Sequence, residues 1–272
     1  MNRLISLLRI AICTALLSAC ATAPSGRSQI LLYSDTQMDQ LGSASFDRLK
    51  SEGKIAREPK REAYVQCVVN ALVAQLPAPW QTTAWEVQVF NDDTANAFAL
   101  PGGKVGVNTG MFAIAENADQ LAAVLGHEIG HVVFRHSNER VSTAAIADTG
   151  LGLVNAYVGA QATAQTSNAV MTALGLGTQV GVLLPFSRKH ESEADLYGQR
   201  LMAQAGFDPA QAVALWQNMS QESGGSRPVA WLSTHPDPTQ RIARLQAEVA
   251  VLQPVKAQAR ERGLRPNCVL RR

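Results

Sequence analysis

The sequence has little net charge, few cysteines and few histidines, and each of these shortages reduces the number of protein classes to which the chain can belong. Its 272 residues carry 24 Lys and Arg against 22 Asp and Glu, for a formal charge of +2. So small an excess provides no basic face of the kind that nucleic-acid binding requires. Because 46% of the residues are hydrophobic and 17% are charged, the chain is typical of a globular protein rather than a mainly disordered one. No internal repeat is present.

Long, strongly apolar runs are also lacking. Residues 149–187 contain no charged residue, but Asn and Gln interrupt the stretch, and Gly, Ala and Thr outnumber Leu, Ile and Val. A membrane-spanning helix needs about 20 predominantly apolar residues. We therefore expect a packed helical hairpin or a mobile cover here, with contact to a membrane as the alternative.

The first residues have the features of an export signal. Residues 1–19 combine two arginines, no acid and apolar runs too short for a spanning helix. They lead into Leu17-Ser18-Ala19-Cys20, which resembles the lipobox of bacterial lipoproteins, in which Cys20 becomes the lipid-modified N-terminus. An ordinary signal peptide with a chance cysteine is the alternative. Ala21 replaces the Asp that usually retains lipoproteins at the inner membrane, so we expect the periplasmic face of the outer membrane, with residues 20–28 as a tether.

The four cysteines separate by position. Cys13 would be removed with the signal, and Cys20 would carry the lipid. Cys67 and Cys268 would remain in an oxidising compartment, where a disulfide between them is expected. Two unpaired buried thiols are the alternative.

The pattern of the remaining chain predicts a single, mainly α-helical α+β domain over residues 29–272. Residues 85–90 alternate with period two, as a strand does, and residues 96–108 indicate two short strands around a Pro-Gly-Gly turn. Helices are expected between residues 30 and 76, from Asn117 to about Arg140, and after the Asp-Pro pairs at 208 and 237.

The motif that indicates chemistry is His127-Glu128-Ile129-Gly130-His131, inside the helix predicted from Asn117. Four residues turn a helix by about 40° beyond one full turn, so the imidazoles of His127 and His131 project side by side and can bind one metal ion. Glu128 is placed to act as general base toward water at that metal. Two surface histidines on a structural helix are the alternative.

A catalytic zinc site needs a third protein ligand and one open position. The metzincin pattern would place Gly and His shortly after the motif, where this chain has Phe134 and Ser137, so that class is excluded. His136 follows His131 by five residues and meets the same ion at a poor angle. We expect it at the surface or behind a ligand.

Glu191 is the better candidate for the third ligand. On a helix, Glu191 and Asp195 share a face, whereas Glu193 is rotated from Glu191 by about 200°. Asp195 can then accept the outer N–H of a ligand histidine and fix its tautomer. We expect Glu193 to be solvated or paired with a base. His190 is expected to point elsewhere on the helix, although it could instead serve as a ligand. For the segment as a whole, the alternative is a charged helix face exposed to solvent.

Four motifs together resemble the HtpX/Oma-like gluzincin zinc metallopeptidases, which include the CAAX prenyl endopeptidases. The motifs are HEIGH, the E-x-x-x-D of Glu191–Asp195, the N-A-F-A-L-P-G-G-K of Asn96–Lys104 and the S-x-H-P-x-x-x-x-R of Ser233–Arg241. The resemblance implies a zincin-like fold with a small β-sheet beside the HExxH helix, one Zn²⁺ per chain and endopeptidase activity. The lipobox favours the periplasmic LoiP-like lipoprotein branch. The membrane-spanning segments of HtpX and the prenyl endopeptidases have no counterpart here.

The resemblance also implies roles for residues outside the motif helix. An edge strand beside the metal, to which an extended peptide can add by backbone hydrogen bonds, would consist of Lys104, Val105, Gly106 and Val107. His235 would approach the open metal position or the developing oxyanion, or else occupy that position in a resting enzyme. Its alternative is a capping or core histidine. Arg241 is expected to pair with an acid near the site.

Taken together, these features predict a zinc-dependent endopeptidase held at the membrane by its N-terminal lipid. Its metal ligands would be His127, His131 and Glu191, and its catalytic residues Glu128, Asp195 and His235. Its substrates would be unfolded, misfolded or unassembled envelope proteins, and no nucleic-acid partner is expected. The alternative function is a lipoprotein chaperone or assembly factor with a latent or structural metal site.

Overall fold

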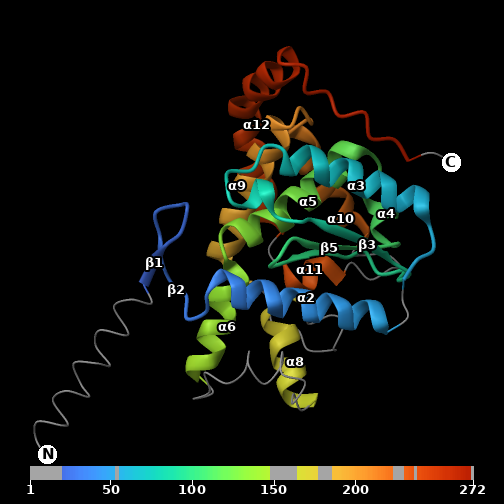
Figure 1. Ribbon diagram of the computed structural model, residues 1–272. Helices are drawn as coiled ribbons and strands as arrows, with labels where there is room; N and C mark the ends of the chain where they lie inside the picture. Colours follow the sequence, from blue (N-terminus) through green and yellow to red (C-terminus); the bar gives the residue numbers. More distant parts are fainter. Residues whose placement is uncertain are drawn as a thin grey trace, which may run out of the picture.

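The computed structural model describes residues 20–52, 55–147, 164–176, 186–222, 230–235 and 238–270 (Figure 1). The predicted export signal at 1–19 lies outside these residues, as does most of the uncharged stretch. The described helices are α2 (Asp35–Ser51), α3 (Pro59–Val73), α4 (Met111–Ile114), α5 (Ala118–Val133), α6 (His136–Ala147), α8 (Ala164–Ala173), α9 (Arg188–Gln204), α10 (Ala210–Glu222), α11 (Ala230–Thr234) and α12 (Pro238–Glu261), with the short 3-10 helix η1 (Trp80–Thr82). They surround a small sheet, which gives the α+β, mainly helical fold that was predicted.

The sheet has three strands in the spatial order β3 (Glu86–Phe90), β5 (Lys104–Asn108) and β4 (Ala97–Leu100). Strand β5 runs parallel to β3 and antiparallel to β4. The prediction that residues 104–107 form an edge strand is therefore wrong, because β5 is hydrogen-bonded on both sides. The outer strand that packs against helix α5 is β4.

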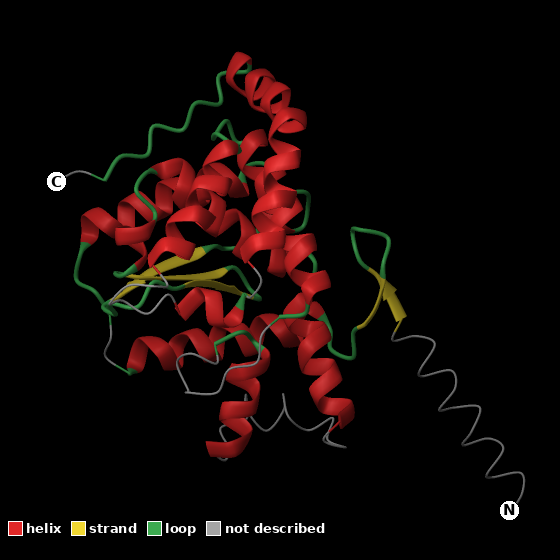
Figure 2. Cartoon of the chain, turned by 180° about the vertical axis from the view of Figure 1, so that it is seen from behind, coloured by secondary structure: helices red, strands yellow, loops and turns green. Residues whose placement is uncertain are grey.

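Helices cover both faces of this sheet (Figure 2). Val87 and Val89 share one hydrophobic cluster with buried residues of α3 and α5. On the other face, Phe46 of α2 meets the rings of Phe90 and Phe98 edge-on, with centroids 6.0 and 6.4 Å apart. Burial on both faces explains why all four residues of β4 are buried instead of alternating with polar ones.

Helix α5 begins as predicted but ends early. The side chain of Asn117 caps it by accepting the backbone N–H of Gln120 at 2.9 Å. It stops at Val133 rather than near residue 140, because Arg135 adopts a left-handed conformation with φ of 55°. Such a residue closes helices at this position. Helix α6 then begins at His136.

Small residues allow α5 and α9 to approach closely. A Cβ atom built on Gly126 would lie 2.9 Å from the carbonyl oxygen of Gly198, and one on Gly198 would lie 2.6 Å from the backbone nitrogen of His127. One turn further along, a Cβ on Gly130 would lie 3.2 Å from the Cα of Ala194. Helix α9 is thereby seated directly on the helix that carries the HExxH motif.

The stretch predicted as a tether forms a hairpin instead. Strand β1 (Cys20–Thr22) pairs antiparallel with β2 (Ser28–Ile30). Arg27, just before β2, forms ion pairs with Glu139 of α6 and Glu193 of α9. The segment therefore contacts the body of the protein rather than forming an unstructured connection.

At the other end of the chain, Cys268 is disulfide-bonded to Cys67 in α3, with the Cα atoms 5.6 Å apart. This confirms the predicted pairing. Because the two cysteines are separated by 201 positions, the bond encloses both helices that carry the predicted metal ligands, α5 and α9.

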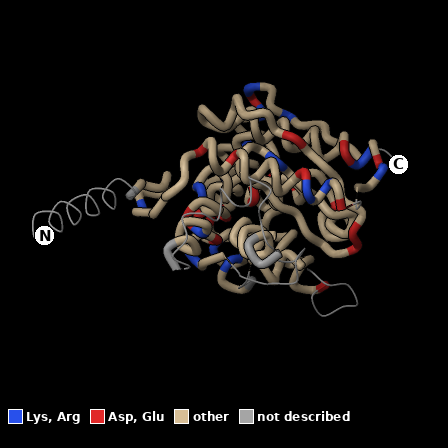
Figure 3. Tube along the Cα trace, turned by 60° about the horizontal axis from the view of Figure 1, so that its bottom comes forward, with Lys and Arg blue, Asp and Glu red and all other residues tan. Residues whose placement is uncertain are grey.

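The described helices include none that is both long and apolar enough to cross a membrane. Helix α8, which makes up most of the described part of the uncharged stretch, packs against α6. Basic and acidic residues are interspersed along the trace, in keeping with the near-neutral composition (Figure 3).

Candidate metal centre

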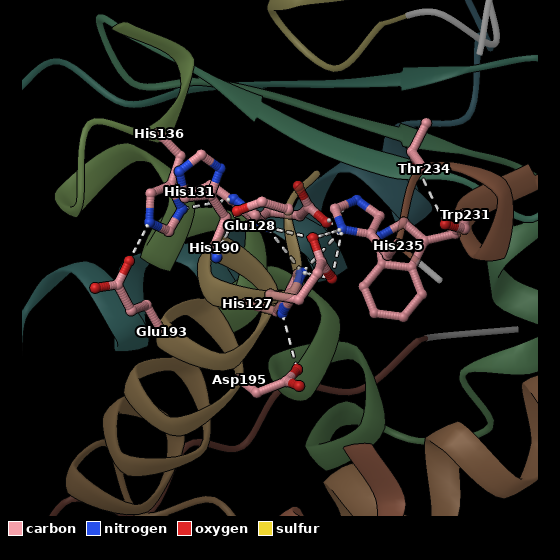
Figure 4. A network of polar contacts seen from close by, with 12 residues as sticks. His127, Glu128, His131, His136, His190, Glu193, Asp195, Trp231, Thr234 and His235 are labelled. Atoms are coloured by element: carbon pink, nitrogen blue, oxygen red, sulfur yellow. Dashed lines mark hydrogen bonds and ion pairs between the residues drawn. The ribbon is translucent and has the colours of Figure 1, made fainter. Parts of the chain in front are cut away.

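Four side chains from three segments of the chain converge in a buried centre (Figure 4). His127 and His131 project from α5, Glu191 from α9, and His235 follows α11. One ligating atom of each residue lies within 4.8 Å of those of the others. The four side chains are almost fully buried, with at most 3% of each residue exposed. The structure thus brings together the two motif histidines and Glu191, and it adds His235 to the group.

The donor atoms are spaced as zinc ligands are. The two Nε2 atoms of His127 and His131 lie 3.0 Å apart, and they lie 3.6 and 3.5 Å from the nearer carboxylate oxygens of Glu191. A tetrahedral zinc ion with bonds of about 2.0–2.1 Å sets its ligand atoms about 3.4 Å apart. Two imidazole nitrogens and a carboxylate oxygen are also a donor set that zinc accepts in hydrolases. The residues present therefore fit zinc.

His127 is oriented from behind by Asp195. Its Nδ1 atom lies 3.1 Å from Oδ1 of Asp195, and the guanidinium of Arg241 donates one hydrogen bond to each oxygen of that carboxylate. When Nδ1–H donates to this carboxylate, Nε2 keeps its lone pair for a metal. Burial would raise the pKa of Asp195, but the charge of Arg241 and the bond to His127 outweigh burial and lower it to about 2. The acid paired with Arg241, which the sequence left unnamed, is thus Asp195, with Glu191 as a second partner.

His131 is oriented from behind by a second histidine. Nδ1 of His136 lies 2.9 Å from Nδ1 of His131, and Nε2 of His136 lies 3.0 Å from Oε2 of Glu193. His136 is completely buried, so it lies behind the ligand and not at the surface. Burial, together with the neighbouring charge of His127, holds the pKa of His131 well below its usual value, which favours the neutral, metal-binding form.

His190 takes no part in the centre. Its Nε2 atom lies 3.1 Å from Oε2 of Glu139, and its ring stacks on His136 with centroids 4.2 Å apart. Burial and the charge of His136 lower the pKa of His190 to about 4. It is a buried neighbour of the network and lies outside the group of four potential ligands.

Glu128 lies beside the donors and is held by a residue that the sequence analysis missed. The indole N–H of Trp231 donates to Oε1 of Glu128 at 2.6 Å, and Nε2 of His235 lies 3.5 Å from the same oxygen. The backbone N–H of Trp231 also donates to the carbonyl of Ala95, just before β4. The four-residue spacing between Trp231 and His235 places the two side chains on one side of a helix. This spacing is the feature of the sequence from which a role for Trp231 could have been predicted.

Comparison with known proteins decides the family. Residues 59–249 match the model of peptidase family M48. The chain belongs to this family. Within the matched residues lie both motif helices and the whole of the centre described above.

Individual M48 relatives agree with this assignment. The chain is 38% identical to mitochondrial metalloendopeptidase OMA1 of Schizosaccharomyces pombe over 184 residues, which is 67% of this chain and 51% of the relative. It is 30% identical to the beta-barrel assembly-enhancing protease of Escherichia coli K12 over 227 residues, or 82% of this chain and 46% of the relative. It is 31% identical to the mitochondrial metalloendopeptidase OMA1 of Danio rerio over 233 residues, which is 81% of this chain and 48% of the relative. The M48 chain therefore spans about half the length of these curated relatives.

Proposed function

We propose that this M48 protein is a zinc-dependent endopeptidase. The observation that carries the proposal is the convergence of His127, His131 and Glu191 in one buried centre, with the carboxylate of Glu128 beside them. A purely structural metal site has no use for an additional carboxylate at its edge, whereas hydrolysis requires a base there.

The residues of the centre would divide the work of peptide hydrolysis. When bound, zinc supplies Lewis-acid activation of water and of the scissile carbonyl. Glu128 would accept the proton of the attacking water and return it to the leaving amine. Asp195 would hold His127 in its metal-binding tautomer, and Arg241 would keep that carboxylate in place.

The substrate would bind along the sheet, at the outer strand β4 rather than at the central strand β5. Outer strands leave a row of backbone groups unpaired, and an extended peptide can add there with little regard to its side chains. Such binding suits misfolded or unassembled envelope proteins as substrates. The name of the Escherichia coli relative, a beta-barrel assembly-enhancing protease, is in keeping with this class.

We place the protein at the periplasmic face of the outer membrane, anchored by a lipid on Cys20. The lipobox-like Leu17-Ser18-Ala19-Cys20 supports the anchor. The Cys67–Cys268 disulfide supports an oxidising compartment.

We assign His235 to a resting form of the enzyme. Its Nδ1 atom lies 3.1 Å from Nε2 of His127 and 2.9 Å from Oε1 of Glu191, where a substrate carbonyl or water would need room. Because Trp231, in the short helix α11 that directly precedes His235, holds Glu128, substrate binding would require this segment to move. This arrangement also favours the second candidate function, an assembly factor whose metal site is latent.

The decisive experiment combines metal analysis with a matched substitution. Glu128→Gln keeps the shape of the side chain and should retain zinc, but it should lose cleavage of unfolded casein. Absence of stoichiometric metal in the wild type would contradict the metal assignment, and wild-type cleavage by the variant would contradict the role of Glu128. The assembly-factor function instead predicts that Glu128→Gln still supports envelope-protein assembly in cells.

A further inference from the structure

A chain of polar contacts leads from His131 to the N-terminal hairpin. His136 links His131 to Glu193, as described above, and Glu193 is bound by the guanidinium of Arg27. Nε and Nη2 of Arg27 donate to the two carboxylate oxygens of Glu193 at 3.2 and 3.1 Å. Ser25 of the same hairpin also donates its hydroxyl to Glu193. The hairpin is thus linked to the back of His131 through Glu193 and His136, and these last three residues are seen together in Figure 4.

This chain parallels the one behind the other motif histidine. His127 is backed by Asp195, whose carboxylate is held by Arg241. His131 is backed by a carboxylate held by Arg27, with His136 inserted between them. In both cases an arginine fixes an acid, and the acid determines which ring nitrogen of a histidine carries hydrogen.

The inserted histidine transmits this preference by a simple alternation of donors and acceptors. A carboxylate bonded to a guanidinium accepts hydrogen bonds, so Nε2–H of His136 donates to Glu193 and its Nδ1 keeps a lone pair. That lone pair accepts Nδ1–H of His131, which leaves Nε2 of His131 free of hydrogen and directed at the other metal ligands. Without the acid, His136 can present N–H to His131 and favour the tautomer that cannot bind a metal.

We propose that Arg27, Glu193 and His136 form a positioning relay that selects the metal-binding tautomer of His131. The relay rests on the proposed function, since it presupposes that the centre binds zinc. It makes the N-terminal hairpin part of the apparatus that holds the metal, although none of the four potential ligands belongs to the hairpin. Displacement of the hairpin would then weaken zinc binding.

A second carboxylate provides the matched control. Arg27 binds Glu139 at 2.7 and 2.8 Å, closer than it binds Glu193. Within the described residues, the other side-chain partner of the Glu139 carboxylate is His190, which is not one of the four potential ligands. If Arg27 only fastened the hairpin to the body of the protein, loss of Glu139 would weaken zinc binding more than loss of Glu193. If the relay operates, loss of Glu193 should weaken zinc binding more.

The test measures zinc dissociation constants of the full chain by competition with a chromophoric chelator. We expect Arg27→Gln and Glu193→Met each to bind zinc about 10-fold more weakly, the lower end of the range for residues that orient metal ligands. Glu193→Gln, which retains an oxygen acceptor for His136, should recover most of this loss. Glu139→Met should change zinc affinity by less than about 3-fold, and Arg48→Gln, in an exposed pair with Glu52, should leave it unchanged.

The outcomes separate the relay from its alternatives. The unfolding midpoint of each chelated variant, followed by circular dichroism, shows whether the protein remains folded. If Glu139→Met weakens zinc binding as much as Glu193→Met, general docking of the hairpin explains the effect and the relay is overturned. Equal affinities of wild type and Glu193→Met overturn the relay alone, whereas a wild type that binds no zinc overturns the proposed function as well.

Discussion

Gly198 lies where helix α9 crosses α5, and its replacement by alanine tests how strongly the metal centre depends on that crossing. An added Cβ would lie 2.6 Å from both the carbonyl carbon of Gly126 and the backbone nitrogen of His127. Neither neighbour is a flexible side chain that could move aside. The two helix backbones must therefore separate.

The required movement is large for a metal site. Raising the 2.6 Å separation to an ordinary contact of 3.4 Å moves the backbones by about 0.8 Å. Metal–ligand distances tolerate about 0.2 Å. Glu191 is carried by α9 and His127 by α5, so the movement separates the ligands. Helix propensity alone would stabilise the variant by about 1 kcal/mol, whereas overpacking typically costs about 1–3 kcal/mol.

We therefore expect Gly198→Ala to lower the unfolding temperature and to weaken zinc binding by about 10-fold or more. Gly126→Ala, with its closest approach at 2.9 Å, should have a smaller effect, and Gly130→Ala, at 3.2 Å, the smallest. Thermal unfolding and chelator competition measure both quantities on the same samples. A Gly198→Ala protein with a higher unfolding temperature and unchanged zinc affinity would refute the reasoning.

Three further predictions concern stability. Replacing Cys67 and Cys268 by serine should lower the free energy of unfolding by about 2–5 kcal/mol. The upper value follows because loop entropy for a separation of 201 positions gives about 5 kcal/mol. Urea unfolding at fixed pH measures the change. Arg241→Met should destabilise the chelated protein by about 3–5 kcal/mol, because it leaves two buried carboxylates without their cation, and Arg241→Lys should recover part of the loss in the same assay. The pKa of Asp195 falls from 3.8 to about 2 on folding, so its contribution is complete above pH 4 and is lost as the pH falls toward 2. Asp195→Asn should therefore flatten the dependence of the free energy of unfolding on pH in that interval. A variant whose curve runs parallel to that of the wild type would contradict the assignment.

Much of the metal centre could be predicted because its residues are close in sequence within each helix. The faces shared by His127 and His131, and by Glu191 and Asp195, follow from the geometry of a single helix. The cysteine pairing followed from the small number of candidates. Both inferences need no knowledge of how distant segments are arranged.

The features that were missed depend on long-range contacts or on unusual backbone conformations. The central position of β5 depends on which strands pair, and the alternation within a strand does not contain that information. The end of α5 depends on a left-handed arginine at position 135, a conformation more often adopted by Gly or Asn. The contact between Arg27 and Glu193 joins residues 166 positions apart, with no local pattern to indicate it.

The Cys67–Cys268 bond has a topological consequence. Everything between the two cysteines, including the HExxH helix and the helix bearing Glu191, belongs to one covalent ring. A single cut anywhere in that ring opens it without releasing a fragment. A nicked molecule would gain the mass of one water, remain intact on a non-reducing gel and divide into two pieces only after reduction. Proteolytic damage, including self-cleavage, would thus leave the two halves of the metal centre physically joined.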